Sequence, residues 1–74
     1  MELKKFKLSA REIEICKLLL TELSLKDISY NLGITYSGVN FHAQNVYRKL
    51  NVQSRTELFV KLGKQIINSE QLTD

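Results

Sequence analysis

The segment 24–51 constrains the fold of this chain more than any other part of the sequence. A short helical pattern opens at Ser24 and ends at Gly33, and a second pattern begins after the turn Gly33-Ile34-Thr35. Glycine after a helical pattern favours a left-handed stop, and threonine is a good N-cap for the next helix. Two helices joined by so short a turn predict a helix-turn-helix.

The second helix of this pair, predicted over 35–50, separates its side chains by chemistry when they are placed at steps of about 100°. The apolar side gathers Val39, Ala43, Val46 and Leu50. The opposite side carries Tyr36, Ser37, Asn40, Phe41, Gln44, Asn45 and Arg48. The aromatic ring of Phe41 lies almost opposite the apolar centre, so we expect it to face solvent or a partner.

The polar side of this helix favours nucleic acid as that partner. Asn40, Gln44 and Arg48 recur every four residues, and amides and guanidinium groups pair bidentately with base edges. Phe41 can contact a thymine methyl group. An amide-rich solvated helix is the alternative, but no Asp or Glu occurs within 35–50, and carboxylates would repel phosphates.

Length and composition narrow the class of protein. A chain of 74 residues with no proline has room for one all-α domain of three or four helices and for no enclosed catalytic cavity. One histidine and one cysteine cannot build a zinc site, a disulfide or a catalytic cluster, so we expect no metal, no cofactor, no small-molecule ligand and no enzyme activity. The net charge of +3 permits nucleic acid. Without a long apolar run or a signal peptide, we expect a cytoplasmic chain that makes no use of a membrane.

Short capping patterns in the sequence predict where four helices start. Capping-box spacing or its Asp variant pairs Ser9 with Glu12, Ser24 with Asp27 and Ser54 with Glu57, and Thr35 is a plain N-cap. Helices are predicted over about 10–23, 25–32, 35–50 and 55–68, within a domain 8–68 flanked by a mobile lead-in 1–7 and a tail 69–74. The first should bury Ile13, Cys16, Leu19 or Leu20, and Leu23, and the second Ile28 and Leu32. Asn51 should take a left-handed conformation after the third, with Val52 packing back.

The predicted fourth helix has a wide apolar arc. Leu58, Phe59, Leu62 and Ile66 occupy one side, and Val60 and Ile67 extend it. A three-helix core cannot cover that much apolar surface, so we expect a dimer seam there, although Gly63 could instead end the helix early.

Three ordered motifs span most of the chain: Leu8-Ser9-x-Arg11-Glu12-x-Glu14-Ile15, then Ser24-x-Lys26-Asp27-Ile28-Ser29-x-x-Leu32-x-Ile34-Thr35, then Val39-x-x-His42-x-x-Asn45-Val46-x-x-Lys49-Leu50-x-Val52-x-x-Arg55. With these motifs the chain resembles the LuxR/FixJ/NarL-type, or GerE-type, helix-turn-helix of bacterial transcription regulators, from residue 8 to about 62. The resemblance implies a four-helix domain that binds a partly palindromic promoter site as a dimer. It places the third helix in the major groove and the fourth at the dimer interface.

The resemblance also implies site residues and partners. Base-reading positions of the family fall at Asn40, Phe41 and Gln44. Phosphate contacts of the family fall near Lys26, Thr35 and Lys49, and we expect Tyr36, Ser37 and Arg48 to add to them. The expected partners are double-stranded DNA, a second copy of the chain bound through Leu58, Phe59, Leu62 and Ile66, and RNA polymerase as a further candidate.

Two departures from the family pattern carry information. Where the family commonly has Thr-Val-Lys, this chain reads Gly38-Val39-Asn40, so an amide replaces a cation and adenine contacts are expected in place of guanine contacts. Glu22 stands where a glycine often ends the first helix, so the sequence does not fix the residue at which that helix ends.

Several single residues have more than one interpretation. Lys26 opposes the dipole of its own helix, which favours a phosphate contact. His42 is expected to pack or bond phosphate as a neutral group, and Cys16 to act as a small core residue. Arg55 either binds phosphate or pairs with Glu12 or Glu14. A rival function is a protein-interaction module of the same fold, which would grip another regulator through Phe41 and the fourth helix without productive DNA contact.

Overall fold

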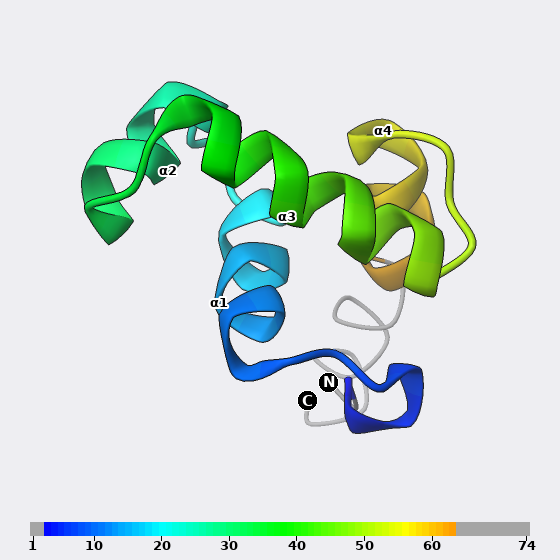
Figure 1. Cartoon of the computed structure of the whole chain (residues 1–74). Coiled ribbons are helices and arrows are strands. Elements are labelled where there is room, and N and C mark those ends of the chain that lie inside the picture. The colour runs from blue at the N-terminus through cyan, green and yellow to red at the C-terminus, as the bar shows by residue number, and fades with distance from the viewer. Residues whose placement is uncertain (1–2, 64–74) are drawn as a thin grey trace, which may run out of the picture.

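The computed structural model describes residues 3–63, and the regular elements within that range are all helical (Figure 1). They are η1 (Lys4–Phe6), α1 (Ala10–Leu19), α2 (Leu25–Leu32), α3 (Tyr36–Lys49), α4 (Arg55–Leu58) and η2 (Phe59–Gly63). The short η1 is a 3-10 turn, and η2 continues α4 as a π-helical turn. The long α3 packs on both α1 and α2, and α4 lies near its end (Figure 1). The prediction of an all-α fold is confirmed.

The predicted helix starts are confirmed at four positions. Full capping boxes join Ser9 to Glu12 and Ser24 to Asp27, because each serine hydroxyl accepts from the third backbone amide while the carboxylate accepts from the serine amide. At α3 the Thr35 hydroxyl accepts from the amide of residue 38 at 3.0 Å. At α4 the Ser54 hydroxyl accepts from the amide of residue 57 at 3.2 Å.

The turn between α2 and α3 also forms as the sequence predicts. Gly33 has a φ of 68°, a left-handed conformation that side chains disfavour, and it ends α2. The Ile34 amide then donates to the carbonyl of Ser29 at 3.0 Å, which returns the chain toward α3. After α3, Asn51 takes a φ of 57° and the Val52 amide donates to the Tyr47 carbonyl at 2.8 Å.

The predicted end of the first helix is wrong by four residues. The sequence suggested 10–23, whereas α1 stops at Leu19. The Thr21 hydroxyl donates to the Leu18 carbonyl and accepts from the amide of Leu23, and these bonds replace the next helical turn. The buried face of α1 consists of Ile15, Cys16 and Leu19 together with Glu12, while Ile13, Leu20 and Leu23 are only half-buried.

One hydrophobic core forms where α1, α2, α3 and the α4–η2 segment meet. Its buried side chains are Leu3, Ile15, Cys16, Leu19, Ile28, Val39, Ala43, Val46, Tyr47, Leu50, Val52, Leu58 and Leu62. The whole predicted apolar side of α3 is therefore buried, as expected. Leu32, expected in the core, is half-buried against it.

The α4–η2 segment corrects the predicted dimer seam at two positions. Leu58 and Leu62 are 0% exposed, so the chain's own core already covers their side chains and leaves them no surface for a second chain. Phe59 and Val60 are 40% and 55% exposed. The predicted continuation of the helix from residue 64 to 68, with Ile66 and Ile67, lies outside the described residues.

Residues 3–7, which the sequence predicted as part of a mobile lead-in over 1–7, have a defined place in the structure. Leu3 is only 4% exposed and belongs to the core, and η1 follows it directly. The Phe6 ring lies under two ammonium groups, with Lys5 Nζ at 5.2 Å and Lys61 Nζ at 5.6 Å from its centroid. Residues 3–7 therefore pack against the end of the domain and complete its core.

Candidate nucleic-acid interface

The outer side of α3 presents the predicted row of polar side chains. Asn40, Gln44 and Arg48 are all exposed, one turn apart, because the opposite side of the helix is buried. Phe41 is 63% exposed, although burial of an aromatic ring would ordinarily be favourable. Only the edge of this ring meets another ring, that of His42, so most of its surface is free to contact a partner.

The start of α3 and the turn before it supply small polar groups beside that row. Thr35, Tyr36 and Ser37 are exposed at the helix N-terminus, where the dipole and the free backbone amides favour an anion. Gly38 is close to the cap, and a Cβ atom there would meet the Thr35 hydroxyl oxygen at 3.2 Å. The absence of a side chain at residue 38 therefore protects the cap that starts α3.

Lys26 and Arg48 bring positive charge to the helix-turn-helix. Lys26 is exposed in the first turn of α2. Arg48 donates through Nη2 to the side-chain oxygen of Asn45 at 2.8 Å, on the preceding turn of the same helix. Because Asn45 is neutral, this bond orients the guanidinium group and leaves its charge uncompensated.

Lys49, also predicted to contact phosphate, has its ammonium group on Glu12. Lys49 Nζ lies 2.7 Å from Glu12 Oε1 and 3.3 Å from the Lys7 carbonyl oxygen. The hydrogen bond from Lys49, followed by that from the Ser9 amide, holds the pKa of the Glu12 carboxyl below its ordinary value of 4.5. This contact joins the start of α1 to the end of α3, so a phosphate would have to compete with a carboxylate for Lys49.

Arg55 does not pair with Glu12 or Glu14, which was one of the two roles expected of it. Its guanidinium group caps the end of α1: Nε donates to the Leu19 carbonyl at 2.9 Å and Nη2 donates to the Thr21 carbonyl at 2.7 Å. The predicted partner Glu14 instead faces Arg11 at 3.9 Å. A cation at the end of a helix neutralises exposed carbonyls and complements the dipole, so Arg55 has a structural role.

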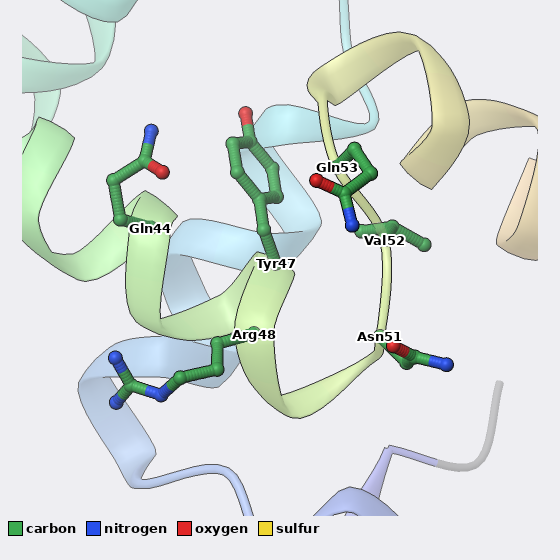
Figure 2. A pocket seen from close by; sticks show the side chains of 6 residues that line it. All are labelled: Gln44, Tyr47, Arg48, Asn51, Val52 and Gln53. Carbon is green, nitrogen blue, oxygen red and sulfur yellow. The ribbon is translucent and has the colours of Figure 1, made fainter.

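Sequence reasoning missed a polar hollow at the end of α3. It has a volume of about 280 Å³ and is lined by Gln44, Tyr47, Arg48, Asn51, Val52 and Gln53 (Figure 2). Two of these residues belong to the predicted row, and the remainder come from the buried edge of α3 and the loop that follows. The sequence predicted the left-handed conformation of Asn51. Nothing in the local pattern, however, indicates that the loop folds back beside the polar row on α3.

His42 and Cys16 occupy the places that the sequence suggested. His42 is half-buried, and its ring meets the edge of Phe41 with the centroids 5.5 Å apart. Cys16 is fully buried, and this burial raises the pKa of its thiol to about 11. A protonated thiol within the core is a small hydrophobic group rather than a reactive one.

Two helices joined by a tight turn, the second with an exposed row of amides and a guanidinium group, define a helix-turn-helix domain of the DNA-binding class. Residues 7–62 match the family model described as "Bacterial regulatory proteins, luxR family". The chain belongs to this family, whose domain is a DNA-binding helix-turn-helix of transcription regulators. Neither the curated proteins nor the solved structures contain a match to it. In the part of the chain that the structure describes, no helix is long and apolar enough to span a membrane.

Proposed function

We propose that this domain regulates transcription by binding a specific double-stranded DNA site with α3 in the major groove. The observation that carries the proposal is the exposed row Asn40, Gln44 and Arg48 on a helix face without carboxylates. Asn40 and Gln44 would pair with adenine edges, and Phe41 would contact a thymine methyl group. Lys26, Thr35, Tyr36, Ser37 and Arg48 would contact phosphates and fix the position of α3.

Lys49 is a special case among the proposed phosphate contacts. Its ammonium group is bonded to a buried carboxylate, so any phosphate it reaches would share it with Glu12. Lys26 and Arg48 are the better sources of phosphate attraction, since neither is paired with an acid among the described residues.

The proposed assembly is a homodimer on a partly palindromic site, with half-sites about one helical turn, or on the order of 10 bp, apart. The neighbouring side chains Phe59 and Val60 support it, because they expose apolar surface that a second copy could cover. Sedimentation of the wild-type chain and of Phe59→Asp tests this step. A dimer that survives Phe59→Asp unchanged would place the contact elsewhere.

The experiment for DNA reading is selection of bound duplexes from a random pool, followed by fluorescence anisotropy on the selected and a scrambled duplex. Asn40→Ala and Gln44→Ala should each reduce the preference for the selected site by ~1–3 kcal/mol. Asn31→Ala, an exposed amide on α2 outside the row, is the matched control and should keep the preference. Full discrimination by both row variants would refute base reading by these residues.

Lys26→Ala should act differently from the row variants. It should weaken binding to the selected and scrambled duplexes alike and lower the slope of log K against log salt by about 0.9, as expected for one lost phosphate contact. A changed sequence preference would mean that Lys26 reads a base.

A protein-interaction module is the second candidate, supported by the exposure of Tyr30, Tyr36 and Phe41. Aromatic side chains are enriched at protein interfaces. The same selection separates the two functions. A protein-binding module would enrich no sequence and would bind duplexes weakly with little dependence on salt.

A further inference from the structure

Residues 3–7, here called the N-terminal strap, run from the start of α1 toward the end of α3 (Figure 1). Leu3 places its side chain in the core, where it is 4% exposed. The Phe6 ring lies 5.6 Å from Lys61 Nζ, and the same ammonium group donates to the carbonyl of Leu50, the C-cap of α3. The strap is therefore attached to the end of the helix that carries the exposed polar row.

The last residue of α3 joins the strap to α1 through its ammonium group. Lys49 Nζ lies 2.7 Å from Glu12 Oε1 and 3.3 Å from the Lys7 carbonyl oxygen. The same Glu12 oxygen accepts from the Ser9 amide at 2.8 Å, which holds the carboxylate where the ammonium group reaches it. The main chain of residue 7 contributes to the cover over this pair, and the Glu12 side chain is 8% exposed. A phosphate competes less well with a covered pair than with one open to water.

Lys7 is the point at which the strap bends before α1. Its φ is 60°, in the left-handed region that residues with a Cβ atom disfavour. Asn51 is the other non-glycine residue with a positive φ within residues 3–63, and asparagine tolerates this region better than lysine does. A strained residue persists only while the surrounding contacts hold it, and the bond from Lys49 to the Lys7 carbonyl is one of those contacts. The closed strap and the position of Lys49 therefore depend on each other.

Lys49 also lies beside the face proposed to contact DNA. It adjoins Arg48 and follows Asn45 by one turn, and its Cα lies about 80° round the helix axis from that of Phe41. The long, flexible stem of a lysine can carry its ammonium group to either side of such a position. The bond to Glu12 directs this group toward the start of α1, away from a phosphate at the border of the groove.

We propose that the N-terminal strap and Glu12 form an autoinhibitory contact that withholds Lys49 from DNA. While the strap is closed, the charge of Lys49 is neutralised within the domain. When the strap opens, water reaches the pair, and Lys49 becomes a further phosphate contact. The inference rests on the proposed function, because the released cation acts on the DNA that α3 reads. It adds a means by which a change before α1 raises affinity for DNA without altering the base-reading side chains.

Glu12→Gln tests whether Lys49 is withheld. Glutamine at this position of a capping box still accepts from the Ser9 amide, so the variant mainly loses the charge that holds Lys49. In anisotropy titrations of the selected duplex across a salt series, its slope of log K against log salt should steepen by about 0.9 per chain, which corresponds to about eightfold tighter binding at about 0.1 M salt. Adding Lys49→Met should abolish this gain. Glu22→Gln, which removes the same charge from an exposed site, is the matched control and should keep the wild-type slope.

Two replacements of Lys7 test the strap itself. Both remove the same ammonium group, but glycine adopts a φ of 60° readily, whereas β-branched valine does not. Lys7→Gly should keep the strap closed and the wild-type salt slope. Lys7→Val should bind the selected duplex several-fold more tightly than Lys7→Gly, with a steeper slope and a limit of about eightfold per chain. Adding Lys49→Met should remove the difference between the two.

The position of Lys49 can also be measured without DNA. Lysine side chains are acetylated with dilute acetic anhydride, and the rate at each site is followed by mass spectrometry. In the wild type Lys49 should react several-fold more slowly than the exposed Lys26, because its side chain is 33% exposed and bonded to Glu12. In Glu12→Gln and Lys7→Val the two rates should converge. Circular dichroism of each variant checks that the domain is folded.

Four results would overturn the inference. They are an unchanged salt slope for Glu12→Gln, a gain in Glu12→Gln that survives Lys49→Met, equal DNA binding by Lys7→Val and Lys7→Gly, and equal acetylation of Lys49 and Lys26 in the wild type. If the wild type selects a duplex, any of these refutes the inference alone. A wild type that selects none refutes the proposed function and this inference with it.

Discussion

Replacing Lys49 by methionine should destabilise the domain while leaving the salt dependence of DNA binding unchanged. Methionine keeps the length of the side chain and has a similar helix propensity, so the variant mainly removes the ammonium group. That group lies 2.7 Å from Glu12 Oε1, and the Glu12 side chain is 8% exposed. The change therefore leaves a buried carboxylate with the single bond from the Ser9 amide.

The size of the effect follows from how far this pair is buried. Removing one partner of a fully buried ion pair costs about 3–5 kcal/mol, and exposed pairs contribute about 0–1 kcal/mol. The Lys49 side chain is 33% exposed and Glu12 is nearly covered, so the pair lies between these limits. We expect Lys49→Met to lower the free energy of unfolding by about 2 kcal/mol, close to the value of a hydrogen bond between charged groups.

Urea unfolding followed by circular dichroism measures this loss. Glu12→Gln and the double variant complete a double-mutant cycle, in which we expect a coupling free energy of about 1–2 kcal/mol. For a domain of this size each kcal/mol should also move the melting temperature by about 4–8 °C.

The pH dependence of the cycle provides a second check. The pKa of the Glu12 carboxyl is lowered in the folded chain from its ordinary value of 4.5, so the folded state favours the ionised form. Its contribution to stability is complete above the unfolded pKa and is lost as the pH falls through the folded pKa. The difference between the wild type and Glu12→Gln should therefore stay constant from neutral pH down to about 6 and shrink in acid.

One combination of results would refute this reasoning about Lys49. It is a coupling free energy below about 0.5 kcal/mol together with a salt slope that falls by about 0.9 for Lys49→Met. Lys49 would then leave Glu12 in solution and contact phosphate, as the family resemblance implies.

Three further variants or treatments test other parts of the fold. Arg55→Ala should lower the free energy of unfolding by about 2–3 kcal/mol, because it removes charged hydrogen bonds to the Leu19 and Thr21 carbonyls; a loss below 0.5 kcal/mol in urea unfolding would mean that water replaces the cap. Gly33→Ala should cost about 1–2 kcal/mol through strain alone, since φ is 68° and no atom lies within 4 Å of the added Cβ; an unchanged urea midpoint would show that the turn relaxes. Cys16 should react with a colorimetric disulfide reagent only as fast as the domain unfolds, because its thiol is buried and has a pKa of about 11; rapid reaction without urea would contradict its place in the core.

Features that depend on residues close together in the sequence could be predicted from it. The serine and threonine caps act across three residues, and Gly33 and Asn51 set their own backbone angles, so the helix starts and the turn were predicted correctly. The buried side of α3 was also predictable, because a 3.6-residue period places its apolar residues on one face.

Contacts between segments far apart in the sequence could not be predicted in this way. Arg55 caps α1 from 36 residues away, and Lys49 reaches Glu12 across 37 residues. No local pattern indicates which carbonyl or carboxylate a basic side chain will meet, so both cations were considered for phosphate. Leu3 was missed for the same reason, since one leucine among lysines has no period and its burial depends on the space left by the other helices.

Several basic side chains form bonds within the domain, and this limits how strongly its affinity for DNA should depend on salt concentration. Among the described residues, Lys49, Arg55 and Lys61 bond carbonyl or carboxylate oxygens, which leaves Lys26 and Arg48 as the charged donors on the helix-turn-helix. Two neutralised phosphates per chain imply that a rise from 50 to 200 mM salt weakens binding about tenfold per chain, far less than the factor of 10³–10⁵ for six to ten contacts. For the proposed homodimer, two such chains would lose about 10²-fold together, so occupancy of the DNA site would still fall during osmotic stress, though less than for a domain with more charged contacts.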